Sequence, residues 1–505
     1  MSKKKEKLLK KQAEREAKLQ EKIKSGEVIR VRYEERGNKP SIANRVSCLE
    51  TVKEEMEERQ DVAEKSMAVY RKMLPTLLKY LGKIKDPRQS GKVKYKIRVL
   101  MVYGILMFVY RAASRREVNR EITRPIFKKN LMMMFPELED MPHADTLFRL
   151  LEKVEAEKIE EAMIELLKEL IRKKKFKNYL RNKNYLIAID GTQKLYRDYK
   201  WAEECLERHV SSTKIEQYYV YVLEAVLVLD NGIVLPLMSE ILRNKEYRDI
   251  TEKQDCERRA FYRLAKRIKS TFPRLKVSVV MDGLYACGPV VRVCRENNWD
   301  YMLVLKEDGL KSVWREATGL MKLTPENSMK YQWGDREQLY RWINDIEYSY
   351  GTNGRFKEML HVVICEETWE EKRRSTGKTE QMYTRYAWIS GRRISRDNVF
   401  RRCTKMARHR WKIENNILVE KHQGYEYEHC FSYNWNAMVG YHYLMKIGRF
   451  LNVIAVNSEV LADKVQELGI DGFLKFLRLA CSGTELEAGR IKEVRESNFY
   501  LRLAA

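Results

Sequence analysis

The stretch Tyr185-Leu-Ile-Ala-Ile-Asp-Gly-Thr-Gln193 decides how the rest of this chain is interpreted. An unbroken apolar run, 185–189, precedes a carboxylate and a glycine. A short apolar run with such a boundary is typical of a strand that is buried on both faces. We therefore expect Asp190 at the carboxyl end of a central strand, where open α/β sheets bind their ligands. A single aspartate in this position is more often a turn former or a helix cap.

Two further carboxylates, distant in sequence, make Asp190 a candidate metal ligand. Asp282 also follows an apolar, strand-like run, 277–281, and precedes a glycine. Glu414 lies in Arg410-Trp-Lys-Ile-Glu-Asn-Asn-Ile-Leu-Val-Glu-Lys421, which has helical character. Two strand-end carboxylates and one helical carboxylate can converge on a pair of Mg²⁺ ions, which prefer oxygen ligands and keep positions open for phosphate. Two such ions about 4 Å apart activate the attacking oxygen and stabilise the leaving oxygen of a phosphoryl transfer.

The composition indicates a large, basic, folded protein. The 505 residues are 44% hydrophobic and carry a formal net charge of +26, from 98 Lys and Arg against 72 Asp and Glu. A chain of this length can bury a large core and form more than one domain. The excess of positive charge favours an extended polyanion as the partner. The alternative is a solvated basic surface without a specific partner.

Cysteine usage and apolar segments restrict the expected compartment. Nine cysteines occur without a Cys-x-x-Cys pair, so neither a zinc module nor a disulfide framework is indicated. Met1–Lys24 lacks the apolar centre of a signal peptide. The most apolar stretch, 99–110, is too short to cross a bilayer, which requires about 20 residues. We expect a cytoplasmic protein without a membrane partner.

The chain divides into six predicted segments. The first alternates Lys, Glu, Arg and Gln with sparse leucines, which is typical of a mobile basic arm. The helical segment that follows is either a DNA-binding domain or a brace for the catalytic core. The segments are a basic arm at 1–40, an all-helical domain at 41–178, the first part of an α/β core at 179–307, a β-rich insertion at 308–390, the second part of the core at 391–455, and a C-terminal helical tail at 456–505.

The first part of the core has the element order of an RNase H-like sheet. A long strand is expected over 218–228, followed by the hairpin turn Asp230-Asn-Gly232 and a returning strand over 233–241. A helix is expected over 253–265, ahead of the strand that leads to Asp282. Strands and helices in this order predict an α/β fold with a mixed sheet.

The densest basic stretch, 392–412, leads directly into the Glu414 helix. On a helix, residues three, four and seven apart share a face, which places Arg410 and Lys421 beside Glu414. Glu414 can hold a metal ion while the two cations contact the adjacent phosphate. A surface helix with opposite-charge pairs is the alternative. The candidate DNA-binding residues are Arg401, Arg402, Arg408, Arg410, Lys412 and Lys421.

Together these motifs resemble bacterial insertion-sequence transposases of the DDE, RNase H-like superfamily, in the branch with a β-rich insertion. That branch carries a Tyr, Arg, Glu, Lys signature, with two, three and six residues between successive members. Arg410, Glu414 and Lys421 match the last three members, whereas Ala407 stands at the tyrosine position. Asp-Gly pairs at 190 and 282 resemble the two aspartate motifs of the family. The similarity extends from about residue 86 to about residue 450.

The resemblance implies an enzyme that cuts DNA at the ends of a mobile element and transfers the freed strands into target DNA. Asp190, Asp282 and Glu414 would be catalytic and would hold two Mg²⁺ ions, for which Mn²⁺ is expected to substitute. In-line displacement by water and then by the freed 3′-hydroxyl needs no covalent intermediate. The implied partners are double-stranded DNA, as terminal inverted repeats and as target, and further copies of the chain. Such a homo-oligomer would be nucleoid-associated when bound to DNA.

Two other functions fit the same residues. A structure-specific nuclease of this fold would cut without joining, and a DNA-binding regulator would keep the fold without catalysis. Glu240 and Glu257 are candidate supplementary acids. Trp333, Trp342 and Trp369 are candidates for stacking on an unpaired base, although packing in the core is the more common role of tryptophan.

Overall fold

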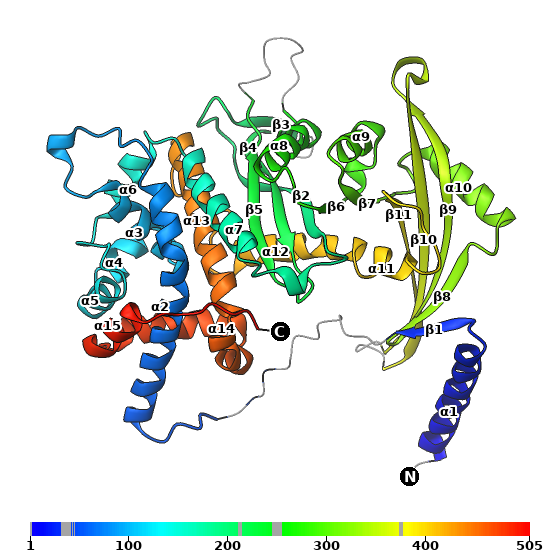
Figure 1. Cartoon of the computed structure of the whole chain (residues 1–505), viewed down its shortest axis with the longest axis horizontal. Helices are drawn as coiled ribbons and strands as arrows, with labels where there is room; N and C mark the ends of the chain where they lie inside the picture. The colour runs from blue at the N-terminus through cyan, green and yellow to red at the C-terminus, as the bar shows by residue number, and fades with distance from the viewer. Residues whose placement is uncertain are drawn as a thin grey trace. The chain divides into compact units, whose positions relative to one another are not determined.

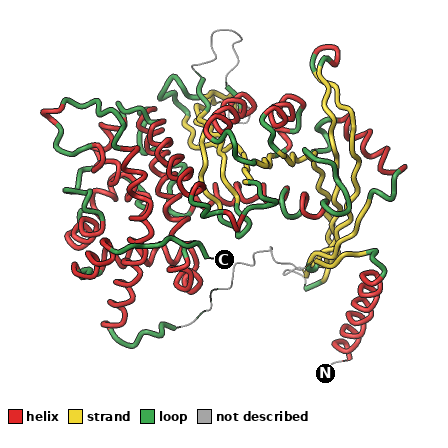
Figure 2. Tube along the Cα trace, in the orientation of Figure 1, coloured by secondary structure: helices red, strands yellow, loops and turns green. Residues whose placement is uncertain are grey.

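The computed structural model describes residues 3–31, 42, 44, 46–210, 215–244, 255–372 and 377–504. The chain forms two compact units, each built from segments that are distant in sequence. Unit 1 comprises Met1–Lys39 and Leu275–Arg410, and unit 2 comprises Pro40–Arg274 and Trp411–Ala505. Both units contain helices and strands, which confirms the expected α/β class (Figures 1 and 2).

Unit 2 contains an antiparallel sheet centred on β4 (Ile215–Val228). Strand β2 (Tyr185–Arg197) pairs with one edge of β4. Strands β3 (Leu206–Val210) and β5 (Val234–Ile241) share its other edge, β3 beside the first residues of β4 and β5 beside the last. Gly232 in the β4–β5 turn has φ of +84°, the left-handed conformation that the predicted hairpin requires. The two strands expected around this turn are confirmed.

Strand β2 continues beyond its expected end. Asp190 lies in the middle of β2, so its predicted place at the carboxyl end of a strand is wrong. The reason is that pairing with β4 persists to Arg197, through a register shift between Gln193 and Leu195. Beyond Asp190, Thr192 and Leu195 are still buried, and this burial sustains the strand. The sequence pattern showed only where the apolar run ends, and the strand does not end there.

Helices cover both faces of this sheet. Helix α8 (Glu257–Thr271) packs on one face, and α12 (Trp411–His422) and α13 (Trp435–Val456) pack on the other. The helix expected over 253–265 corresponds to α8. Residues 253 and 254 of the expected helix lie outside the described part of the chain. Almost all of α13 is buried, because it lies between the sheet and the helical part of unit 2 (Figure 1).

The segment ahead of β2 is helical, as expected. Helix α2 begins at a capping box, in which the Thr51 side chain accepts from the Glu54 backbone and the Glu54 carboxylate accepts from the Thr51 backbone. Helix α3 (Ile97–Val109) is apolar apart from the exposed Arg98, and all its other residues are buried, many of them against α13. The helices are α2 (Val52–Leu81), α3 (Ile97–Val109), α4 (Arg115–Glu121), α5 (Pro125–Met134), α6 (Ala144–Leu151) and α7 (Glu157–Arg172).

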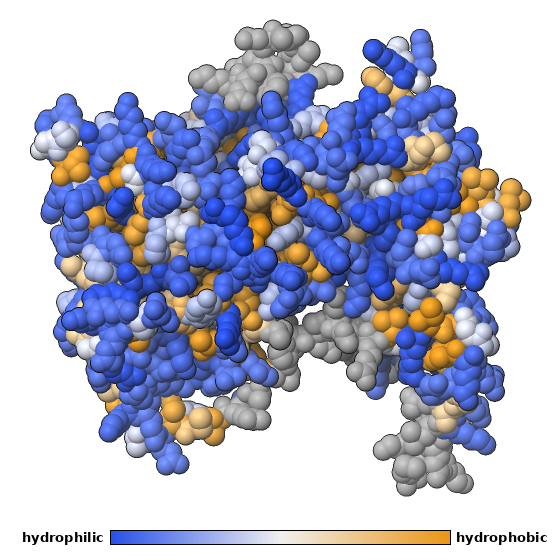
Figure 3. All heavy atoms as spheres, viewed as in Figure 1, coloured by the Kyte–Doolittle hydropathy of each residue, from blue (hydrophilic) through white to orange (hydrophobic). Residues whose placement is uncertain are grey.

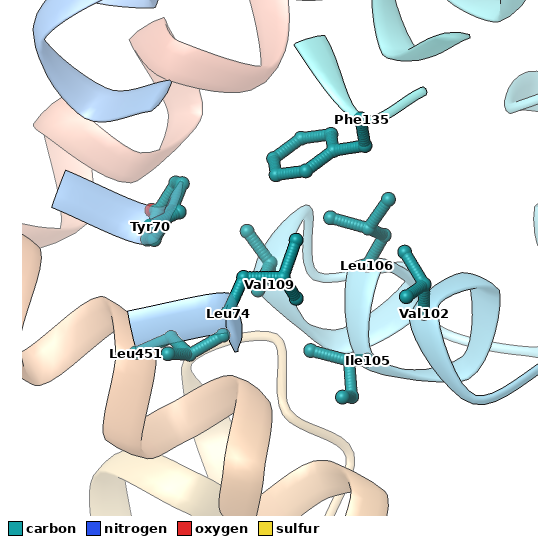
Figure 4. A pocket seen from close by; sticks show the side chains of 8 residues that line it. All are labelled: Tyr70, Leu74, Val102, Ile105, Leu106, Val109, Phe135 and Leu451. Carbon is teal, nitrogen blue, oxygen red and sulfur yellow. The ribbon is translucent and has the colours of Figure 1, made fainter. Parts of the chain in front are cut away.

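Two C-terminal helices complete the core of this helical part. Helices α14 (Ala462–Gly483) and α15 (Ala488–Glu496) pack against α2 and α5. A small apolar cavity of about 10 Å³ remains among α2, α3 and α13, with Tyr70, Leu106 and Leu451 in its wall (Figure 4). A cavity of this size holds at most one water molecule, so it is a packing defect of the core and no ligand site.

Unit 1 contains a mixed sheet in the order β1-β8-β9-β10-β11-β7-β6. The pairs β1–β8 and β6–β7 are parallel, and the others are antiparallel. The insertion expected at 308–390 supplies β8 to β11 and also a helix that was not predicted, α10 (Lys311–Leu323). The strands are β1 (Val28–Val31), β6 (Val277–Met281), β7 (Asp300–Val304), β8 (Ser328–Trp333), β9 (Arg336–Tyr350), β10 (Phe356–Lys372) and β11 (Thr379–Ser390).

The N-terminal segment joins this sheet. Helix α1 (Lys3–Lys24) packs against β1, and β1 pairs in parallel with β8, where Val28 is buried. No pattern within residues 28–31 predicts this pairing. Residues 1, 2 and 32–40 of the predicted arm lie outside the described residues.

The visible surface is mainly hydrophilic, with hydrophobic residues scattered in small groups (Figure 3). Among the helices that the structure describes, none combines the length and the apolar content that a bilayer crossing requires.

Candidate metal and DNA site

Asp190 lies on the face of the unit 2 sheet that α12 and α13 cover. In the antiparallel register it stands opposite Glu224 of β4, so the two side chains share a face. Glu224 contacts Lys446 of α13, which identifies that face. Asp190 is half-buried, and its Oδ1 accepts a hydrogen bond from the Gly191 amide at 3.0 Å. The carboxylate is therefore held at the border between the core and solvent.

Gly191 faces the opposite side of β2, where α8 packs. A Cβ atom at this position would lie 2.6 Å from a carboxylate oxygen of Glu257 and 2.6 Å from the ring of Tyr221. The Tyr221 hydroxyl donates to Glu257 at 2.8 Å. A glycine beside Asp190 thus allows the first turn of α8 to approach the strand. Glu257, a predicted supplementary acid, adjoins the strand on the face away from the Asp190 carboxylate.

Glu414 lies in the first turn of α12, which confirms its helical placement. Its neighbours Ile413 and Ile417 are buried against the sheet, and Glu414 is half-buried beside them. Lys421 is seven residues further along, on the same side of the helix, and its Nζ lies 2.7 Å from Glu428. Helix α12 contacts β2, the strand that carries Asp190. Both carboxylates thus belong to one helix–sheet layer of unit 2.

A buried charge cluster that the sequence did not predict lies between α12, α13 and the sheet. The Lys446 ammonium lies 2.9 Å from Glu224 and 2.6 Å from Glu420, and the Tyr427 hydroxyl donates to Glu224 at 2.8 Å. All four residues are at most 2% exposed. We call Glu224, Glu420, Tyr427 and Lys446 the Glu224 cluster. It joins α12, through Glu420, to the residue directly opposite Asp190 on the neighbouring strand.

Lys194 of β2 adjoins the Glu224 cluster. Its Nζ donates to the Tyr427 carbonyl at 2.7 Å and lies 4.6 Å from the centre of the Tyr427 ring. Burial, and after it the charge of Lys446, lowers the pKa of Lys194 to about 8. The sequence signal for the cluster was a lysine at 446 within the mainly apolar helix 435–456, since a buried lysine requires compensating partners.

Asp282 directly follows β6 in unit 1, as predicted. Its side chain caps the short helix η4 (Gly283–Tyr285) and accepts from the Leu284 amide at 2.9 Å. Because β6 and β7 are parallel, the residues that follow them meet at one edge of the sheet. There the exposed Lys306 lies over Gly283, where a Cβ would be 2.8 Å from its stem. Lys306 is a cation beside Asp282 that sequence reasoning did not identify.

Two of the predicted DNA-binding arginines are engaged inside unit 1. Arg402 is 5% exposed and makes two bonds to the Asp300 carboxylate, at 2.8 and 2.9 Å. Arg408 pairs with the buried Glu367, and its guanidinium lies over the Trp333 ring. These contacts neutralise both charges, so we leave the two arginines out of the proposed DNA contacts.

The other predicted cations differ in exposure. Arg401 is exposed, and Lys412 and Lys421 are half-buried. Arg410 is 7% exposed and ends the 3₁₀ helix η6 (Ala407–Arg410), so α12 begins one residue after it. Arg410 therefore belongs to the 3₁₀ turn and Glu414 to the α-helix, so the two residues are not four positions apart on one regular α-helix, as was expected from the sequence.

The tryptophans considered for base stacking are packed. Trp333 and Trp342 are at most 5% exposed. The Arg336 guanidinium covers the Trp369 ring at 3.8 Å from its centre. Glu240, the other candidate acid, pairs with two arginines of α8. These positions favour structural roles.

The three predicted metal ligands are divided between the units. Asp190 and Glu414 belong to unit 2, and Asp282 belongs to unit 1. In the described part of the chain, no group of three or more His, Cys, Asp or Glu residues has an arrangement that could hold a metal ion. The donors themselves are carboxylates, which suit Mg²⁺ or Mn²⁺ and not a soft metal. The two-metal assignment stays a prediction.

One known domain family matches a segment of the helical part of unit 2. Residues 78–167 match the model of a domain family described as DDE_Tnp_1-associated. The matched segment runs from the end of α2 into α7 and ends shortly before the strand that carries Asp190. The match indicates a DDE-type transposase family. A search of curated proteins found no match.

Proposed function

We propose that this protein is a DDE transposase with an RNase H-like catalytic core, belonging to the bacterial insertion-sequence branch with a Tyr-Arg-Glu-Lys signature. The observation that carries the proposal is the DDE_Tnp_1-associated segment at 78–167, which precedes the strand that carries Asp190. The half-buried Asp190 and Glu414 on one helix–sheet layer, and Asp282 at the end of β6, support it.

In this proposal Asp190, Asp282 and Glu414 hold two Mg²⁺ ions, for which Mn²⁺ substitutes. Bound Mg²⁺ supplies activation of the attacking oxygen and neutralisation of the leaving oxygen. The first reaction cuts DNA at the ends of the element, and the second joins the freed 3′-hydroxyl to target DNA. The cations Arg401, Arg410, Lys412 and Lys421 neutralise and position the phosphates. The Glu224 cluster keeps α12 in register with the strand beside Asp190.

The proposed partners are double-stranded DNA and further copies of the chain. DNA enters as the terminal inverted repeats of the element and as the target. The net charge of +26 suits such a polyanion. Synapsis of two element ends requires at least two active sites, so we propose a homo-oligomer on DNA. A nuclease of the same fold, which cuts without joining, is the second candidate, because cutting and joining use the same carboxylates.

A strand-transfer assay tests this proposal. The substrate is DNA that carries the element's own ends, with Mg²⁺ and a target plasmid. We expect joined product with the wild type. Asp190→Ala, Asp282→Ala and Glu414→Ala should each lower cutting by about 10³-fold or more, because each removes a metal ligand. DNA binding should change by less than about threefold, since cations supply it.

The matched control is Asp198→Ala, which removes an exposed carboxylate just beyond β2 and should leave cutting unchanged. Cut product without joined product would support the nuclease. Binding without either product would support a catalytically silent regulator. Near-normal cutting by any one of the three variants would remove that residue from the proposed site.

A further inference from the structure

Helix α1 carries a stripe of cations along one face. Lys4, Lys7, Lys11, Arg15, Lys18 and Lys22 are separated by three or four residues, so they occupy one row of the helix. We call these six residues the α1 stripe. Glu14 borders the row, and six positive charges with one negative charge give this face a net charge of +5. At 1.5 Å per residue the stripe is about 27 Å long.

The charges of Arg15, Lys18 and Lys22, the members of the stripe whose side chains are described, are poorly compensated. Arg15, Lys18 and Lys22 are exposed. Arg15 pairs with Glu370 at 2.7 Å, with 59% and 50% of the two side chains exposed. Such an exposed pair contributes little to stability and separates readily. Among the described residues, Lys18 and Lys22 have no acidic partner within ion-pair distance.

The described side chains of α1 are exposed, except for the half-buried Leu19 and Ile23. The helix packs against β1, and Arg30 of β1 pairs with Glu16 at 2.7 Å. Figure 1 shows α1 extending away from β1. Leu19 and Ile23, on the adjoining side of the helix, are half-buried, so the apolar packing of the described side chains is confined to that side. The cationic side takes no part in this packing and is open to a charged partner.

We propose that the α1 stripe binds the phosphates of double-stranded DNA. The identity of the polyanion rests on the proposed function. Duplex DNA carries one negative charge per about 1.7 Å of axis, so a 27 Å row of cations meets several phosphates. Lysine contacts of this kind position a duplex and read no sequence. The stripe would add a second, sequence-independent DNA contact, separate from the candidate metal ligands.

The test compares two full-length variants that lose the same charge. The stripe variant carries Lys11→Gln, Arg15→Gln, Lys18→Gln and Lys22→Gln. The control variant carries Lys3→Gln, Lys5→Gln, Lys10→Gln and Lys24→Gln, on other faces of α1. Binding to a fluorescent duplex of arbitrary sequence is measured by anisotropy over a range of salt concentrations. Circular dichroism verifies that both variants keep the helix content of the wild type.

Each lost phosphate contact makes the slope of log K against log salt shallower by about 0.9. We expect the magnitude of this slope to fall by about 3 for the stripe variant and by less than about 1 for the control. At about 0.1 M salt the stripe variant alone should lose DNA affinity by about tenfold or more. Equal slopes for the two variants overturn the stripe and leave the transposase proposal intact. A stripe variant that changes sedimentation but not the slope also overturns it, because α1 would then mediate self-association. A wild type that does not bind duplex DNA at all would contradict the proposed function itself.

Discussion

The Glu224 cluster and the α1 stripe place charge in opposite ways. In the cluster, Lys446 lies within 3 Å of two carboxylates, and every member is buried. Along the stripe, like charges follow one another, and Arg15, Lys18 and Lys22 are exposed. Buried charges that are compensated fix the geometry of neighbouring elements, because separating them leaves a desolvated ion. Exposed charges that are not compensated contribute little to stability and remain available to a partner.

The largest effect that we expect on stability comes from Lys446→Met. The variant leaves Glu224 and Glu420 buried without their cation, which should cost about 3–5 kcal/mol of unfolding free energy. Urea denaturation followed by circular dichroism measures this loss. The matched control is Lys475→Met, which removes an exposed lysine paired with Asp471 and should cost less than about 0.5 kcal/mol. Equal losses in the two variants would mean that the cluster does not fix α12.

Glu160 lies between the Glu224 cluster and the α1 stripe in its exposure, because the carboxylate is buried and its partner Arg267 is half-exposed. It is 1% exposed, accepts from the Ser239 amide at 2.6 Å and pairs with Arg267 of α8. Burial raises the pKa of Glu160 from its usual 4.5 to about 7, against the opposing charge of Arg267. Its contribution to stability is therefore complete below about pH 4.5 and is lost as the pH rises through about 7.

We expect the wild type to lose on the order of 3 kcal/mol of unfolding free energy between pH 5 and pH 8 through this group. Glu160→Gln keeps a neutral acceptor and should lose much less over the same interval. Denaturant titrations at the two pH values measure the difference. Parallel losses in the wild type and the variant would show that another group titrates.

The smallest effect should come from the α1 stripe. Its four-residue glutamine variant should change the unfolding free energy by less than about 0.5 kcal/mol, since Arg15, Lys18 and Lys22 are exposed. Thermal unfolding measures this value. A loss above about 1.5 kcal/mol would mean that the stripe supports the fold, and the contrast with the Glu224 cluster would disappear.

Local patterns predicted the local elements. The Asp-Asn-Gly turn, the strand that ends before Asp282 and the helix around Glu414 were all identified, because turn residues and hydrophobic periodicity act over a few positions. The extension of β2 beyond Asp190 and the pairing of β1 with β8 were not identified. Both depend on partner strands that are distant in sequence, and no pattern within the segment itself shows them.

The basic residues show the same limit within the candidate site. In the sequence, every arginine and lysine of the basic stretch 392–412 is an equally good candidate for binding DNA. The fold separates them, since Arg402 is fixed to Asp300 in the core while Arg401, one residue earlier, is exposed. The Glu224 cluster was missed for a related reason: its acids and its lysine come from β4, α12 and α13, and their compensation exists only after folding.

The parallel pairing of β1 with β8 has a practical consequence. Strand β1 is the last strand at its side of the unit 1 sheet, so it covers main-chain donors and acceptors of β8 that would otherwise face solvent. An uncovered strand edge is a template for aggregation. A deletion designed to remove only the basic helix should therefore stop before Glu27. A deletion that continues through Val31 would expose the edge of β8 and make the protein prone to aggregation. The resulting low solubility could be mistaken for a loss of DNA affinity.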